Sequence, residues 1–278
     1  MRVLALLDGT VLDGDTPLLA ADDLGALRGD GVFETLLVVG GRPRMLDAHL
    51  VRLANSARML DLPAPDVAGW RRCVAAVCGA WRGGELVLKL VITRGRHEHG
   101  QPTCFAFGMP LAESVPRQRR DGVAVLALDR GYPAGLGERA PWLLIGAKTL
   151  SYAVNMAAMR YAEAAGADDV VFVSSDGWVL EGPTSTVVIA NGRMLRTPPV
   201  AAGVLPGITQ RELFDAAVSD PAAGWATKSE PLRLKDLYAA DGVWLVSSVR
   251  LLARVRTLDG QPLPDGNLTA ELMALLPG

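Results

Sequence analysis

The chain has 278 residues, of which 50% are hydrophobic and 21% are charged, a balance typical of a globular protein with one or two domains. Its net charge of −2 provides no basic field that would attract nucleic acid. Three cysteines are too few for a disulfide framework, and neither their spacing nor the HEHG string at 97–100 fits a zinc site. Without a signal peptide or an 18-residue apolar run, we expect a cytoplasmic protein with no bound metal.

The first part of the chain predicts strands and two helices. Gly40-Gly41 separates two strand-like segments and predicts a β-hairpin. Asp47 is the expected N-cap of a helix whose apolar residues recur at helical spacing. In chain order we expect strands over 1–7 and 31–39, helices over 48–60 and 66–80, and strands near 85–93 and 103–109.

The polar segment 113–121 is the expected linker between an N-terminal α+β domain, 1–112, and a larger C-terminal domain, 122–278. Composition alone leaves open that this segment is a surface loop inside one domain.

The C-terminal part mixes strands and helices without regular βαβ alternation, which favours an α+β or mixed α/β fold. Asn191-Gly192 predicts a tight hairpin between the strands on either side. We expect strands at 123–128, 170–173, 178–181, 186–190, 193–197, 243–247 and 250–256, and helices at 150–165, 208–218, 233–239 and 268–276.

Several polar residues have settings that suggest chemistry, although each also fits an ordinary structural role. Lys148 lies among apolar residues, and desolvation favours the neutral, nucleophilic amine that forms Schiff bases. Glu181 ends a predicted strand, and Arg52 follows three residues after a histidine on the first helix. Thr209 begins a helix, where free N–H groups can bind an anion. Ser247-Ser248 alone indicates a turn.

Taken together, these segments resemble the class IV aminotransferases, the fold type IV family of pyridoxal 5'-phosphate (PLP) enzymes. The resemblance implies the two-domain fold of D-amino acid aminotransferase, with PLP in the cleft and two copies of the chain in a homodimer. The matching segments are GDGVFET (29–35), HLVRL (49–53), Lys148 before a helix, DDVVFVSSDGWVLEGPTSTVVIANG (168–192) and GVLPGITQREL (203–213).

The resemblance implies a role for each matching residue. Lys148 would form the Schiff base with PLP and move protons, and Glu181 would face the pyridine nitrogen. Arg52 would bind the cofactor phosphate, together with the backbone N–H groups of Ile208 and Thr209 and the Thr209 hydroxyl. Ser248 and Ser247 match a further phosphate or substrate contact.

The family contains 4-amino-4-deoxychorismate lyases, D-amino acid aminotransferases and branched-chain aminotransferases, and the resemblance favours the lyase. Segments 29–53 and 86–95 most resemble the lyase and D-amino acid branches. Thr35 is a candidate catalytic hydroxyl, because it is expected to end the strand that opens the cleft. Tyr152 departs from the lyase pattern and could shape an amino-acid pocket. The candidate ligands for substrate carboxylates are Arg28, Arg94 and Arg96.

An inactive PLP-binding protein is a further reading of the sequence. The presence of both Lys148 and Glu181 argues against it, because loss of either would mark a decayed enzyme.

Overall fold

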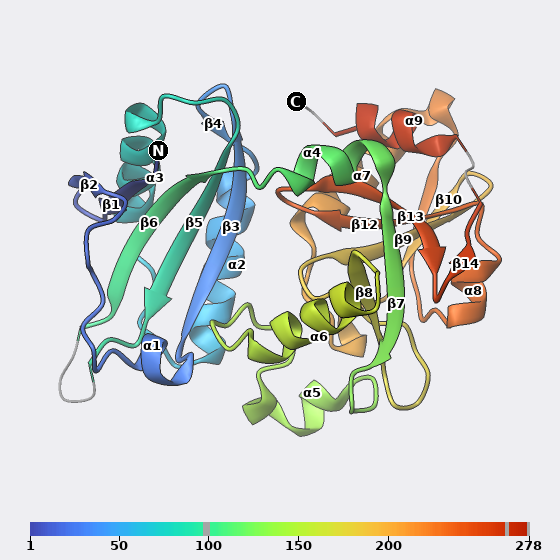
Figure 1. The fold of residues 1–278 in the computed structure, drawn as a ribbon, viewed down its shortest axis with the longest axis horizontal. Coiled ribbons are helices and arrows are strands. Elements are labelled where there is room, and N and C mark those ends of the chain that lie inside the picture. The colour runs from blue at the N-terminus through green and yellow to red at the C-terminus, as the bar shows by residue number, and fades with distance from the viewer. Residues whose placement is uncertain (97–100, 265–266, 277–278) are drawn as a thin grey trace. The chain divides into compact units, whose positions relative to one another are not determined.

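The computed structural model describes residues 1–96, 101–264 and 267–276 (Figure 1), so the HEHG string lies outside the described residues. The chain forms two compact units. Unit 1 contains Met1–Ala112 and the short segment Ala147–Tyr152, and unit 2 contains Glu113–Gly146 and Ala153–Gly278. The chain therefore leaves unit 1, returns to it for six residues around Lys148, and leaves it again.

Unit 1 is built on an antiparallel sheet with the strand order β2-β1-β6-β5-β3-β4. Its strands are β1 (Val3–Leu6), β2 (Val11–Asp13), β3 (Gly31–Val39), β4 (Arg42–Pro43), β5 (Leu86–Thr93) and β6 (Thr103–Pro110). Its helices are α1 (Leu24–Arg28), α2 (Leu46–Met59) and α3 (Val67–Ala80). The hairpin expected at Gly40-Gly41 is present between β3 and β4.

Helices α2 and α3 lie on the same face of this sheet (Figure 1), where α2 contacts β3 and α3 contacts β1 and β6. Alternate strand residues point to opposite faces, so the fully buried Val32, Glu34 and Leu36 of β3 point towards α2. Leu50 and Leu53 of α2 complete the core at this position. The other face carries the half-buried Phe33 and Thr35.

The returning segment Ala147–Tyr152 adds to the edge of β3. Val32 and Thr149 form an antiparallel bridge, and the amide of Phe33 donates to the carbonyl of Lys148 at 3.0 Å. Gly31 must be glycine at this junction, because a Cβ there would collide with the carbonyl oxygen of Ile92. The pairing fixes Lys148 opposite Phe33 in the sheet register.

Unit 2 is built on a second, mixed sheet with the order β11-β10-β9-β12-β13-β7-β8, with β14 beside β13. The strands are β7 (Val123–Asp129), β8 (Asp169–Val173), β9 (Thr186–Asn191), β10 (Met194–Thr197), β11 (Ala226–Ser229), β12 (Gly242–Ser247), β13 (Leu251–Leu258) and β14 (Gln261–Pro262). The helices are α4 (Ser114–Asp121), α5 (Leu136–Arg139), α6 (Ala153–Ala164), α7 (Ile208–Ser219), α8 (Leu234–Tyr238) and α9 (Leu268–Ala274). Strand β7 runs parallel to both of its neighbours, β13 and β8, and β10 runs parallel to β11.

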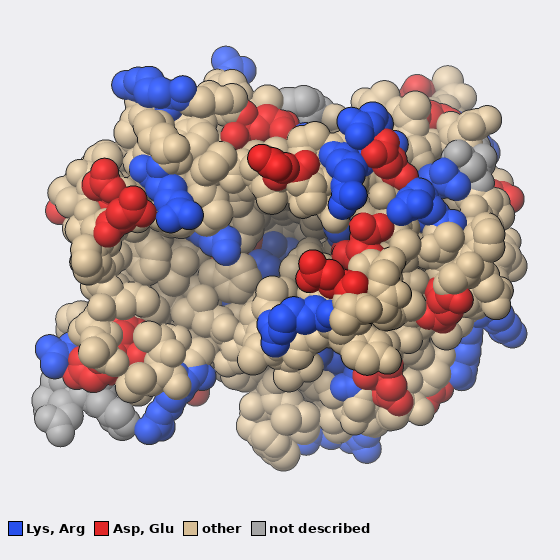
Figure 2. Space-filling view, in the orientation of Figure 1, with Lys and Arg blue, Asp and Glu red and all other residues tan. Residues whose placement is uncertain are grey.

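Both faces of the second sheet are covered. Val187 and Ile189 of β9 belong to one buried cluster, whereas the alternate residues Val188 and Ala190 belong to another that includes Trp244. The hairpin expected at Asn191-Gly192 is confirmed by the pairing of β9 with β10. On the face shown in Figure 2, Lys and Arg side chains are interspersed with Asp and Glu.

Two local predictions differ from the structure. Asp47 lies in the first turn of α2, whose N-cap is Met45 in the left-handed region, with φ 50°. The segment predicted as the linker, 113–121, contains α4, which packs against β13, and its role as a linker between domains stays a prediction. Residues 178–181 form no strand, because only Val179 makes a bridge, to Val173. Within the described part of the chain, no helix is long and apolar enough to cross a membrane.

Candidate active site

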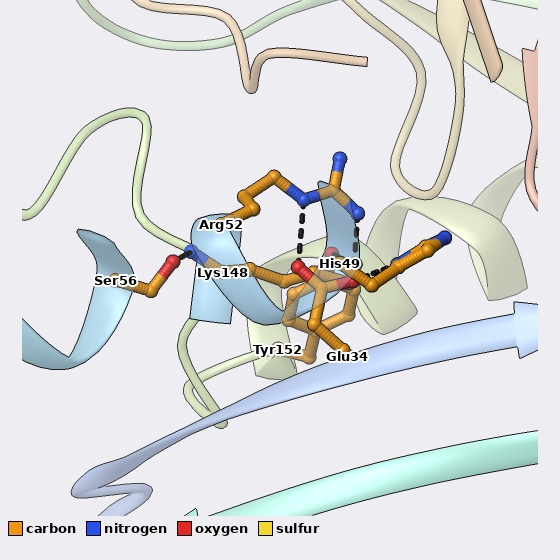
Figure 3. Close-up of polar contacts among 6 residues, drawn as sticks. All are labelled: Glu34, His49, Arg52, Ser56, Lys148 and Tyr152. Atoms are coloured by element: carbon orange, nitrogen blue, oxygen red, sulfur yellow. Dashed lines mark hydrogen bonds and ion pairs between the residues drawn. The ribbon is translucent and has the colours of Figure 1, made fainter. Parts of the chain in front are cut away.

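Lys148 is held through its backbone on the edge of β3, and its side chain is buried, with 8% exposed (Figure 3). Its amide donates to the hydroxyl of Ser56 on α2 at 3.0 Å. Its Nζ donates to Tyr152 Oη at 3.0 Å and lies 4.4 Å from the centre of the Phe33 ring. Phe33 and Tyr152 pack edge to face, with ring centres 5.1 Å apart. The amine is thus oriented by a hydroxyl and two aromatic rings.

Glu34, His49 and Arg52 form a polar cluster between β3 and α2 (Figure 3). The carboxylate of Glu34 accepts from Arg52 Nε at 2.7 Å and Arg52 Nη2 at 2.8 Å. It also contacts His49 Nδ1 at 2.7 Å. Burial alone would raise the pKa of Glu34, but the charge and hydrogen bonds of Arg52, with the His49 hydrogen bond, outweigh it and lower that pKa to about 2. Glu34 is therefore ionised near neutral pH.

His49 completes this cluster as a neutral donor. Burial lowers the pKa of His49 below 6.5, against the opposing effect of Glu34. A neutral imidazole facing a carboxylate through Nδ1 carries its proton there, so His49 donates to Glu34. Glu34 was not identified from the sequence. It could have been found as an acidic residue at a core-facing position of an otherwise apolar strand.

Glu181 of unit 2 follows β8 and is half-buried. Its Oε2 accepts from the amide of Leu205 at 3.0 Å, and its carbonyl accepts from the amide of Phe172. Nearby, the Ser185 hydroxyl is buried and has no hydrogen-bond partner among the described residues. A Cβ on Gly182 would collide with that hydroxyl, so the glycine allows the tight turn after Glu181. Ser185 was not identified from the sequence.

The N-terminus of α7 begins at Ile208, and both Ile208 and Thr209 are buried. The N-cap, Gly207, provides no side-chain cap for the first turn. A Cβ on Gly207 would collide with the Thr186 hydroxyl, so glycine holds the helix end close to β9. Helix N-termini of this kind bind phosphate through backbone N–H groups. Ser247 ends β12, and the half-buried Ser248 begins the turn that follows.

The remaining candidates have varied surroundings. Thr35 lies in the middle of β3, opposite Lys89, because the strand continues to Val39. Arg94 pairs with Asp30 at 2.7 Å, and Arg96 pairs with Asp22 at 2.8 Å. Arg28 is exposed in the last turn of α1, so the part of these three arginines in substrate binding stays a prediction.

The polar groups described above are of the kinds that bind PLP. The Lys148 amine suits a Schiff base, a carboxylate such as Glu181 suits a protonated pyridine nitrogen, and the uncapped start of α7 suits a phosphate. By contrast, no group of three or more potential metal-ligating side chains occurs in residues 1–96, 101–264 and 267–276.

Fold and residues together define a PLP-dependent enzyme. Residues 31–258 match the family described as amino-transferase class IV, and the chain belongs to that family. It is therefore a PLP-dependent lyase or transaminase with a fold type IV architecture.

Similar proteins cover nearly the whole chain. A Mycobacterium tuberculosis protein named bifunctional aminodeoxychorismate lyase / D-amino acid transaminase is 50% identical over 268 residues, covering 93% of this chain and 92% of its own. The PLP-bound structure of a hypothetical aminotransferase from the same organism is 48% identical, with a TM-score of 0.95 over 99% of this chain and 97% of its own. Its form with alpha-ketoglutarate and PMP is 49% identical, with a TM-score of 0.94 over 99% and 98%.

Proposed function

We propose that this protein is a 4-amino-4-deoxychorismate lyase, which eliminates pyruvate and releases 4-aminobenzoate for folate synthesis. The observation that carries the proposal is the buried Lys148 amine, held against Tyr152 and Phe33, in a chain 50% identical to a bifunctional lyase and transaminase. The lyase reaction needs one amine that both removes and returns a proton, and Lys148 can do both.

Each residue has a defined task in this proposal. PLP, when bound, supplies the electron sink for the reaction. Lys148 Nζ takes the proton from the amine-bearing ring carbon of the substrate and gives a proton to the departing pyruvate enol. Glu181 keeps a proton on the cofactor's ring nitrogen. Arg52 binds the phosphate with a guanidinium whose orientation Glu34 fixes, and the start of α7 supplies further donors.

A second activity, transamination of D-amino acids, is favoured by two observations. The 50% identical relative is named for both activities, and the structure at 49% identity holds alpha-ketoglutarate and PMP. Tyr152 offers a hydroxyl at Lys148 Nζ, which could direct the returned proton to a different atom. We further propose a homodimer, in line with the family resemblance, which sedimentation equilibrium of the purified protein tests.

The decisive experiment supplies freshly generated 4-amino-4-deoxychorismate to the PLP-loaded protein, with no oxo acid present. We expect catalytic formation of 4-aminobenzoate and pyruvate in equal amounts, and none from the Lys148→Ala variant. If no product forms in a preparation that shows the visible absorption of lysine-bound PLP, the lyase proposal is wrong. D-alanine and branched-chain donors with 2-oxoglutarate then test the transaminase reading.

A further inference from the structure

The turn between β12 and β13 lies beside the start of α7. Val246 of β12 pairs with Thr186 of β9, and a Cβ on Gly207, the N-cap of α7, would collide with the Thr186 hydroxyl. Ser247 follows Val246 and ends β12, and Ser248 begins the turn. The two serines and the uncapped N–H groups of α7 therefore gather at the same end of the unit 2 sheet.

This turn has a strained backbone. Ser247 pairs with Leu251, so the connection between the strands contains only residues 248–250. Leu251, which closes it, has φ 61°, in the left-handed region that glycine adopts without strain. Such a conformation persists where the surrounding structure fixes it, and this often occurs at binding sites. We therefore looked for contacts that hold the turn.

Two arginines anchor the turn to α4 and β8. Arg250 is 7% exposed, and its Nη1 lies 2.7 Å from Oδ2 of the fully buried Asp169 at the start of β8. The same Nη1 donates to Gln118 Oε1 of α4 at 3.4 Å. Arg119 of α4, which packs against β13 (Figure 1), donates through Nη2 to the carbonyl of Val249 at 2.7 Å. The last two residues of the turn are thus fixed from two sides.

Stability alone does not account for the Arg250–Asp169 pair. Nε and Nη2 of Arg250 are buried and have no hydrogen-bond partner in the part of the chain that the structure describes. A buried ion pair that is incompletely hydrogen-bonded contributes little net stability compared with apolar side chains of similar size. The pair is better explained by the position that it gives to the turn.

We propose that Arg250 is a positioning residue for the cofactor phosphate. Anchored on Asp169, it holds the β12–β13 turn so that the hydroxyls of Ser247 and Ser248 face a phosphate bound at the start of α7. This inference rests on the proposed site, in which these serines and α7 bind the phosphate. Arg250 acts through the turn and does not need to contact the cofactor itself.

The test measures the Kd of PLP and of pyridoxal for the full-length protein freed of cofactor. Pyridoxal lacks the phosphate but carries the same aldehyde for Lys148, so the ratio of the two Kd values reports on the phosphate site. Arg250→Met alone would strand a buried carboxylate, so the main variant is Arg250→Met/Asp169→Asn, which removes both charges. Arg196→Met/Glu230→Gln removes a half-buried ion pair on the β10–β11 side of the same sheet and is the matched control.

We expect Arg250→Met/Asp169→Asn to raise the Kd of PLP about tenfold and to leave that of pyridoxal within about twofold, because hydrogen bonds to the charged phosphate are weakened. The control should match the wild type for both ligands. Ser247→Ala/Ser248→Ala should show the same selective loss. Combining it with the main variant should lower PLP affinity little further, since both act through the same hydroxyls.

Three results would overturn the role of Arg250. They are an unchanged PLP affinity, an equal loss for PLP and pyridoxal, and losses that add fully to those of the serine variant. The thermal unfolding midpoint of Arg250→Met/Asp169→Asn should be unchanged or raised, and a clear fall with an unchanged Kd ratio would make the pair structural. If the wild type does not turn over 4-amino-4-deoxychorismate, the proposed function fails, while the Kd ratio still decides the role of Arg250.

Discussion

The carboxylate of Glu34 receives both Nε and Nη2 of Arg52, at 2.7 and 2.8 Å, in a buried position between β3 and α2. Such a fork-shaped pair fixes the plane of the guanidinium as well as its position. Buried ion pairs contribute little net stability compared with apolar packing. We propose that the pair supports the rest of the Arg52 guanidinium as a ligand for the cofactor phosphate.

Glu34→Gln should destabilise the apo-protein by about 3 kcal/mol, because the buried Arg52 charge loses its counter-charge. It should also weaken PLP binding. Urea unfolding and a PLP titration measure the two effects. In the double variant Glu34→Gln/Arg52→Met the stranded charge is absent, so part of the stability should return. Wild-type stability in Glu34→Gln alone would show that the pair has no such role.

The stability of the protein should fall on acidification in two stages. The folded-state pKa of Glu34 is about 2, below its ordinary 4.5, so its stabilisation is present above pH 4.5 and is lost as the pH falls towards 2. At about 1.4 kcal/mol per unit this contribution is roughly 3 kcal/mol. Burial also lowers the pKa of His49, so its contribution begins to fall below pH 6.5. Unfolding free energies measured against pH should lose the upper stage in His49→Asn and the lower stage in Glu34→Gln. A single profile shared by all three proteins would contradict both assignments.

Tyr152→Phe removes the hydroxyl that accepts from Lys148 Nζ but keeps the ring that packs on Phe33. We expect kcat to fall about tenfold with KM little changed, since one hydrogen bond that orients the Lys148 amine is lost. Steady-state kinetics with 4-amino-4-deoxychorismate and D-alanine also report any change in the ratio of the two activities. Tyr161→Phe, on the exposed side of α6, is the matched control and should behave as wild type. An equal effect of both changes would remove Tyr152 from the site.

Glu181→Gln keeps an acceptor for the Leu205 amide but removes the negative charge. PLP should remain bound, and proton removal should slow about 10- to 100-fold, because the charge-assisted hydrogen bond to the ring nitrogen is lost. Single-turnover absorbance measurements follow this step. The exposed Glu163 offers Glu163→Gln as a control. An unchanged rate in Glu181→Gln would mean that another group holds the ring-nitrogen proton.

Lys148→Ala should abolish turnover and the borohydride-reducible link between protein and PLP. Mass spectrometry after reduction measures the link, and Lys228→Ala should retain it. Turnover at the wild-type rate in Lys148→Ala would end the assignment of this lysine.

Local signals in the sequence were sufficient for most of the secondary structure. The nine-residue strand β3 and the Asn191-Gly192 hairpin follow from strand propensity and turn chemistry alone. The segment 178–181 has the composition of a strand, but only Val179 forms a bridge. The start of α2 was misplaced because Met45, in a left-handed conformation, precedes the helix without a side-chain cap.

The candidate site was less accessible to sequence reasoning, because its partners are distant in the chain. The residues to consider followed from the resemblance, but the Glu34–Arg52 pair and the Ser56 contact to Lys148 depend on how α2 packs against β3 and the returning segment. The Arg250–Asp169 pair depends on how the β12–β13 turn lies relative to the start of β8. Periodicity within one segment carries no information about such cross-strand neighbours.

The segment Ala147–Tyr152, which packs with unit 1, limits where the protein can be divided into fragments. A fragment that ends at Ala112 would lack the strand that pairs with Gly31 and Phe33, and would expose unsatisfied backbone groups along the edge of β3. Such an edge invites self-association, but it is also a template that a synthetic peptide spanning 145–154 could complete by strand addition. The sheet of unit 1 and the peptide that carries Lys148 could then be supplied as two separate molecules. A peptide with an unnatural amine in place of Lys148 could be used without changing the gene.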